Sequence, residues 1–157
     1  MKIKVLSIGK TDNKNIQVLL EDYKKRLSHY GPFEWVELPD VKNVKNLSEA
    51  QQKQAEAQLV LKQLTPADQL ILLDEKGKRL SSEDFAQYMQ KKMNSGLKQL
   101  VLLIGGPYGF SPDLYQRANG KLSLSDMTFS HQMVRLFLIE QLYRAHTILR
   151  NEPYHHR

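Results

Sequence analysis

Two short, continuous apolar runs constrain the fold of this 157-residue chain most strongly. The runs LILL (70–73) and LVLLI (100–104) contain no polar alternation, which is typical of strands buried on both faces of a parallel sheet. Segments of helical period separate these runs from each other and from an alternating strand at Lys2–Ile8. Alternation of strands and helices predicts one α/β domain over residues 1–157, with a mostly parallel sheet flanked by helices on both faces.

The same patterns predict the remaining elements. An apolar stripe from Ile16 to Leu27 predicts a helix that ends before Gly31-Pro32, and residues 41–47, which have no period, are expected to form an exposed loop. Further strands are expected at 33–40 and 121–124, and the apolar run from 69 is expected to end near Asp74 and turn at Lys76-Gly77. Further helices are expected from Ser48 to about Leu64, where Ser48 and Gln51 have capping-box spacing, over Ser82–Asn94, and from His131.

Composition limits the classes of function. The chain carries 23 Lys and Arg against 17 Asp and Glu, a net charge of +6, which favours a polyanionic partner or simply keeps the protein in solution. There is no cysteine, which excludes disulfides and thiolate chemistry and fits a reducing compartment. No apolar run approaches the roughly 18 residues of a membrane span, and the segment MKIKVLSIGK is expected to be a strand and not a signal peptide. We therefore expect a cytoplasmic protein without membrane contact.

The segment LIGGPYGFSPDLYQR (103–117) places Gly105, Gly106 and Gly109 directly after the most apolar run. Ligands of open α/β sheets bind at the carboxyl ends of the strands, and glycines allow a ligand to approach the backbone. The spacing matches neither a dinucleotide fingerprint nor a phosphate loop. A tight turn without a ligand and a binding loop both remain possible. Ser111, with a proline after it, is expected to cap a helix.

The helix expected from His131 is apolar on nearly every face between residues 133 and 143. Such a helix must be buried on two sides, which predicts a second subunit against it. Its charges are interpreted differently: Glu140 and Arg144 have the spacing of a structural ion pair, whereas Arg135 is the better candidate for a substrate or phosphate contact. Before this helix, the polar run 123–130 has two interpretations: it is a loop without a ligand, or its free backbone amides and carbonyls form hydrogen bonds with the edge of an adenine.

The C-terminal segment NEPYHHR combines an aromatic ring, two imidazoles and a guanidinium. Adjacent His155 and His156 are a weak metal signal because no carboxylate or cysteine accompanies them. A frayed end is a second interpretation. The same side chains can also stack on a base and hold a phosphate.

Together, LLIGGPYG, LSLSDMTFSHQMVRLFLIEQLYRA and NEPYH, with KIKVLSIGK at the start, resemble the SPOUT-class ribosomal RNA methyltransferases of the large-subunit methyltransferase H type. The resemblance runs from Met1 to His155. It implies methyl transfer from S-adenosylmethionine to N3 of a pseudouridine in 23S rRNA, without a metal. A non-enzymatic RNA- or nucleotide-binding α/β module is the alternative, and the run SLSDMTFSHQMVR counts against it because a simple basic binder does not need such a segment.

The resemblance further implies an α/β knot, in which a trefoil knot within about residues 69–157 holds the cofactor. It implies a homodimer across the helix from His131, acting on 23S rRNA in the large subunit or the assembled ribosome. Ser130 stands where the family usually has proline. The implied cofactor contacts are Leu73, Gly105, Leu124, Ser125, Asp126, Met127, Thr128 and Phe129, and the implied catalytic candidates are His131, Arg144, Tyr154 and His155.

Overall fold

The computed structural model describes residues 1–156 and contains one five-stranded sheet. The strand order is β2-β1-β4-β3-β5, and every strand pairing is parallel, which confirms the predicted α/β class. The strands are β1 (Lys2–Ile8), β2 (Phe33–Leu38), β3 (Gln69–Arg79), β4 (Gln99–Ile104) and β5 (Gly120–Ser123). The helices are α1 (Lys14–Ser28), α2 (Glu49–Leu61), α3 (Ser82–Asn94), α4 (Pro112–Arg117) and α5 (His131–Leu149), with a short 3-10 turn η1 (Val44–Asn46).

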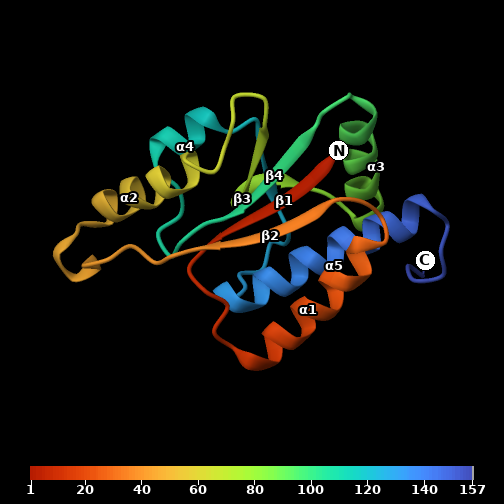
Figure 1. Ribbon diagram of the computed structural model, residues 1–157, viewed down its shortest axis with the longest axis horizontal. Coiled ribbons are helices and arrows are strands. Elements are labelled where there is room, and N and C mark those ends of the chain that lie inside the picture. The colour runs from red at the N-terminus through yellow and green to blue at the C-terminus, as the bar shows by residue number, and fades with distance from the viewer. Residues whose placement is uncertain (157) are drawn as a thin grey trace.

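Helices cover both faces of the sheet (Figure 1). Because successive side chains of a strand point to opposite faces, β4 supplies both cores. Leu100 and Leu102 pack in the cluster that contains the buried sides of α1, α3 and α5. Val101 and Leu103 pack in the cluster that contains α2 and α4. This burial on both faces explains why the sequence of β4 is an uninterrupted run of apolar residues.

Polar caps set the helix starts as the sequence predicted. The Ser48 side chain accepts from the Gln51 amide, and the Gln51 side chain accepts from the Ser48 amide, which completes the capping box of α2. Ser111 caps α4, and Ser130 caps α5 by accepting from the Met133 amide at 3.3 Å. A serine side chain therefore fixes the start of α5.

Strand β3 differs from the sequence prediction. It does not end near Asp74 but continues to Arg79, with a shift in its register with β5 between Leu73 and Lys78. Gly77 permits this, because a Cβ at this position would lie 2.5 Å from the Leu122 carbonyl carbon. The added length carries β3 past the end of β4 and gives the hollow described below a wall. Smaller differences are the earlier ends of β2 and α2, at Leu38 and Leu61.

Within residues 1–156, none of the helices combines the length and apolar character that crossing a membrane requires. The trefoil knot and the assignment of cofactor binding to residues 69–157 remain predictions.

Candidate functional site

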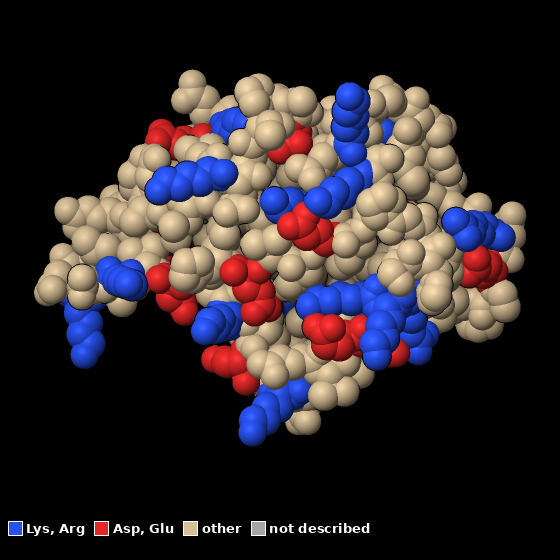
Figure 2. Space-filling model, in the orientation of Figure 1, with Lys and Arg blue, Asp and Glu red and all other residues tan. Residues whose placement is uncertain are grey.

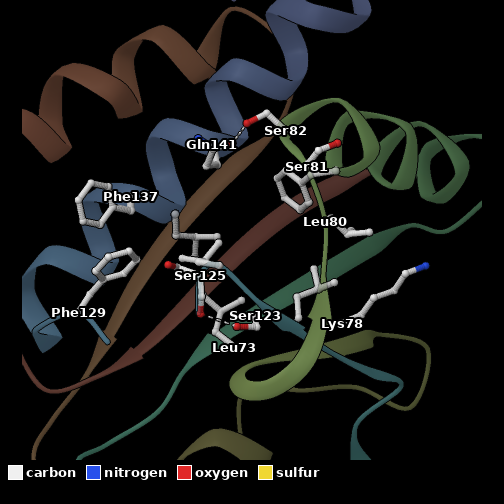
Figure 3. Close-up of a pocket in the computed structure, with 14 residues that line it drawn as sticks. Leu73, Lys78, Leu80, Ser81, Ser82, Ser123, Ser125, Phe129, Phe137 and Gln141 are labelled. Carbon is white, nitrogen blue, oxygen red and sulfur yellow. Dashed lines mark hydrogen bonds between the residues drawn. The ribbon is translucent and has the colours of Figure 1, made fainter. Parts of the chain in front are cut away.

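Two adjoining hollows lie around Leu73, where β3 and β5 meet the loop before α5. The first has a volume of about 270 Å³ and extends from Phe129 along α5 to Gln141 (Figure 3). The second has a volume of about 400 Å³ and opens toward Asp74 and Arg79. We call the pair the β3–β5 hollow; both parts are lined by Leu73, Leu122, Ser123, Leu124, Ser125 and Phe129.

The loop that borders this hollow is held by its own hydroxyl groups. The Ser123 hydroxyl donates to the Ser125 carbonyl at 3.0 Å, and the Ser125 hydroxyl accepts from the Met127 amide at 2.9 Å. Arg79 at the end of β3 forms an ion pair with Asp126. Side-chain groups therefore hold the loop from both sides, and Met127 remains 77% exposed.

A third, smaller hollow of about 160 Å³ continues from Leu73 toward Gly105 and His131. The structure thus brings all eight predicted cofactor residues to the walls of three hollows that share Leu73 and Phe129. Leu73 and Phe129 line all three, Gly105 lines the smallest, and the other five belong to the loop 124–128.

The glycine segment differs in detail from its prediction. Of its three glycines only Gly109 has a positive φ, at 79°. A Cβ at Gly105 would lie 2.7 Å from Phe110 Cε1, and a Cβ at Gly106 would lie 2.5 Å from Glu56 Oε1. Protein side chains therefore occupy the space beside these two Cα atoms, while both glycines border the smallest hollow.

Three of the four catalytic candidates gather around Glu140 on α5. Arg144 Nη2 pairs with Glu140 Oε1 at 2.6 Å, which confirms the predicted ion pair. The Tyr154 hydroxyl donates to the same oxygen at 3.0 Å and lies 3.0 Å from the Tyr23 hydroxyl. Arg144 Nη1 lies 3.1 Å from His155 Nδ1. Tyr154 and His155 are thus part of an ordered cluster, which rules out the interpretation of these two residues as a frayed end.

Two groups of this cluster, Tyr154 and Arg144, are suited to donate hydrogen bonds and not to accept protons. Burial, with the hydrogen bonds to Tyr23 and Glu140, raises the pKa of Tyr154 far above its ordinary value, so the phenol keeps its proton. The hydrogen bond with Glu140 raises the pKa of Arg144 despite partial burial. Since a guanidinium can only donate, His155 Nδ1 is the acceptor in their contact, and the ring's other nitrogen faces Glu83 at 3.7 Å.

His131 lies apart from this cluster. It begins α5, thirteen positions before Arg144, which corresponds to about 20 Å along a helix axis. Burial and the nearby Arg135 charge lower the pKa of His131, so its ring is neutral near pH 7. The catalytic candidate His131 and the cluster around Glu140 therefore lie toward opposite ends of α5.

The prediction that Arg135 contacts a substrate or phosphate is wrong. The side chain is 2% exposed, and its guanidinium donates to the Ile8 carbonyl at 2.9 Å, the Gly9 carbonyl at 3.0 Å and the Thr11 hydroxyl at 2.8 Å. Glu37 lies 3.6 Å away as its ionic partner. Arg135 therefore fastens α5 to the ends of β1 and β2.

Helix α5 is not covered on all sides within one chain. Its inner face buries Leu138, Ile139 and Leu142, whereas Met133 and Phe137 are 36% and 37% exposed. The Phe137 ring contacts the Phe129 ring, with centroids 4.6 Å apart. This leaves an apolar strip, defined by Met127, Phe129, Met133 and Phe137, beside the β3–β5 hollow.

Sequence reasoning missed one buried carboxylate near these hollows. Glu56 on α2 is 4% exposed and approaches Gly106 at the end of β4. The only sequence signal is its position, one helical turn before buried Val60 on the same face of α2.

The surplus positive charge does not form one uniform patch on the face in Figure 2. Lys and Arg side chains lie across this face, with Asp and Glu among them. Within residues 1–156, no three His, Asp or Glu side chains lie together in a group able to hold a metal ion.

Comparisons with known proteins identify relatives along the whole chain. The family described as "Predicted SPOUT methyltransferase" matches residues 1–155. Proteins named ribosomal RNA large subunit methyltransferase H from Flavobacterium psychrophilum and Flavobacterium johnsoniae are each 65% identical to this chain over 157 residues, covering all of both chains. The protein of that name from Parabacteroides distasonis is 59% identical over 156 residues, 99% of each chain. The chain belongs to the SPOUT methyltransferase family.

Proposed function

We propose that this protein transfers a methyl group from S-adenosylmethionine to N3 of a pseudouridine in 23S rRNA. Full-length identity of 65% to proteins named ribosomal RNA large subunit methyltransferase H supports the activity. The observation that carries the proposal is that all eight residues expected to contact the cofactor line hollows around Leu73.

The walls of the β3–β5 hollow fit the parts of S-adenosylmethionine. Leu73, Leu124 and Phe129 offer apolar surfaces to the faces of adenine, and the loop backbone beside them offers amides and carbonyls to its edge. Lys76 and Arg79, with acidic neighbours, line the more polar part, where the charged amino-acid end would be held. When bound, the cofactor supplies an activated methyl group on a sulfonium.

The protein's own groups would align the acceptor. The N3 nitrogen must lose its proton during transfer, so hydrogen-bonding groups around the base are needed. His131, whose lowered pKa leaves it neutral, borders the smallest hollow beside Gly105. Arg144 and Tyr154 keep their protons and would donate to the base or to its phosphate.

A homodimer across α5 would bring these two groups of candidates together. In a twofold arrangement with the α5 helices antiparallel, the C-terminal cluster of one chain would lie near His131 of the other. The apolar strip at Met127, Phe129, Met133 and Phe137 supports this surface as the interface, because these side chains otherwise face water. We place the dimer in the cytoplasm, acting on the large subunit or the assembled ribosome.

The test uses large ribosomal subunits from a strain that lacks this gene. Incubation with the protein and S-adenosylmethionine labelled in its methyl group is expected to label one 23S rRNA nucleotide, identified by mass spectrometry as N3-methylpseudouridine. Calorimetric titration with S-adenosylmethionine is expected to show saturable binding. Absence of both heat and label would favour the alternative, a non-enzymatic RNA-binding module.

A further inference from the structure

A fourth hollow, of about 310 Å³, lies at the carboxyl ends of β1 and β4. The connection that leaves β1 leads to β2 on one side, and the connection that leaves the neighbouring strand β4 leads past β3 to β5 on the other side, so this is the point where the sheet order reverses. Ligands of open α/β sheets bind at such points. We call it the switch-point pocket; its volume is at the lower end of the roughly 300–1,000 Å³ typical of small-molecule sites.

The buried carboxylate of Glu56 lines this pocket. It accepts one hydrogen bond, from Gln52 Nε2 at 3.2 Å, and forms no ion pair with any residue in the range 1–156. Buried polar groups are normally paired, so a buried carboxylate that accepts a single hydrogen bond and lines a pocket indicates a ligand.

The switch-point pocket adjoins the proposed methyl-donor site. Gly106 and His131 line both this pocket and the smallest hollow beside Gly105. Gly106 also explains why Glu56 can come so close, because any side chain there would collide with the carboxylate. A site for the methyl donor on one side of Gly106 and a site for the methyl acceptor on the other side would bring the two ligands into contact.

The charges in the pocket select its ligand. Asp12, Asp40 and Glu56 outnumber the cation Lys10, since the Arg135 guanidinium is bound to the carbonyls at the end of β1. A phosphate would be repelled, whereas a ring N–H would find acceptors. The charged or titratable groups that line this pocket are Lys10, Asp12, Asp40, Glu56, His131 and Arg135.

We propose that the switch-point pocket receives the acceptor pyrimidine and that Glu56 accepts the proton of its ring N–H. This inference rests on the proposed methyltransferase function. In the step, the N–H bond breaks and the proton passes to the carboxylate of Glu56. The nitrogen's electron pair forms the new bond to the methyl carbon, while the electrons of the C–S bond remain on sulfur as a neutral thioether.

The environment of Glu56 agrees with this role. Burial, and secondarily the charge of Asp40, raises its pKa above the ordinary 4.5, although the Gln52 hydrogen bond opposes the shift. The folded chain therefore holds this proton more tightly than the unfolded chain. Between pH 4.5 and the folded pKa, stability falls as pH rises, so the ionised carboxylate destabilises the fold near neutral pH.

The test compares Glu56→Gln with Glu56→Asp and with the control Glu49→Gln, which removes an exposed carboxylate from the first turn of the same helix. Glu56→Gln is expected to bind S-adenosylmethionine normally and to melt no lower than wild type at pH 7. Its single-turnover rate of methylation of large subunits should fall by about 100-fold or more, and this rate should no longer increase with pH. Glu56→Asp should keep that rise at a reduced rate, and Glu49→Gln should match wild type.

A Glu56→Gln variant that methylates at the wild-type rate, or that melts lower at pH 7 with an unchanged pH profile, would overturn the inference and leave Glu56 a structural residue. Wild-type protein that binds S-adenosylmethionine without methylating any subunit would instead refute the proposed function beneath it.

Discussion

Replacing Arg135 with leucine is expected to destabilise the fold strongly, because its buried guanidinium binds α5 to the end of β1. The substitution would leave the Ile8 and Gly9 carbonyls without their donor and Glu37 without its cation. Breaking a buried pair by removing one partner costs about 3–5 kcal/mol. For a domain of this size, 1 kcal/mol corresponds to about 2–4 °C, so the melting temperature should fall by about 6–20 °C.

Urea unfolding and a thermal melt of purified Arg135→Leu measure this loss. The control is Lys24→Leu, which removes a partly exposed cation whose partner Glu21 lies 2.7 Å away on the surface of α1. A surface pair contributes about 0–1 kcal/mol, so the control should unfold close to wild type. Arg135→Lys should also lose stability, since an ammonium cannot reproduce a fork that reaches three acceptors.

The opposite result would restore the hypothesis drawn from the sequence. If Arg135→Leu unfolds at the wild-type urea concentration and binds S-adenosylmethionine, but no longer binds large subunits, then the side chain contacts RNA. The structural assignment would then be wrong.

Four further outcomes are expected. Tyr154→Phe should lower the unfolding free energy by about 1 kcal/mol and leave cofactor titrations unchanged; if single-turnover methylation also stays at the wild-type rate, its proposed role fails. Phe137→Glu should give monomers in sedimentation, and a monomeric wild type at micromolar concentration would contradict the proposed dimer. The pKa of His146 is lowered, chiefly by burial, so its contribution to stability is present above its ordinary value of 6.5 and is lost as pH falls; His146→Phe should therefore show a smaller drop in melting temperature between about pH 7 and about pH 5. Gly105→Val should lose stability as well as cofactor binding, because a Cβ there meets the Phe110 ring at 2.7 Å; an unchanged melt would show that the ring moves aside.

Features set by neighbouring residues could be predicted from the sequence. The start of α5 follows from Ser130, and the capping box of α2 follows from Ser48 and Gln51. The parallel sheet follows from the apolar runs, since only burial on both faces tolerates them. In each case the interacting groups lie within a few positions of each other or repeat with a fixed period.

The misassigned features depend on distant partners. The segment DEKGKR, which begins at Asp74, has the composition of a turn, yet it continues β3 because the backbone near Leu122 lies against Gly77. Arg135 in an apolar helix has the same local pattern whether it faces a ligand or the core. Its acceptors lie more than 120 positions earlier, at Ile8, Gly9 and Thr11, where no periodicity reveals them.

The two adjacent glycines after β4 combine a contact with a residue nearby in the sequence and a contact with a distant one. The space beside Gly105 is filled by Phe110, which lies five positions later, and the space beside Gly106 is filled by Glu56, which comes from another helix. The first contact shapes the wall of the hollow proposed for the methyl donor, and the second holds a carboxylate at the wall of the switch-point pocket. A side chain at Gly106 would displace that carboxylate from the boundary between the two sites. The requirement for glycine at 106 would then arise from the acceptor side of the reaction, whereas at 105 it arises from packing.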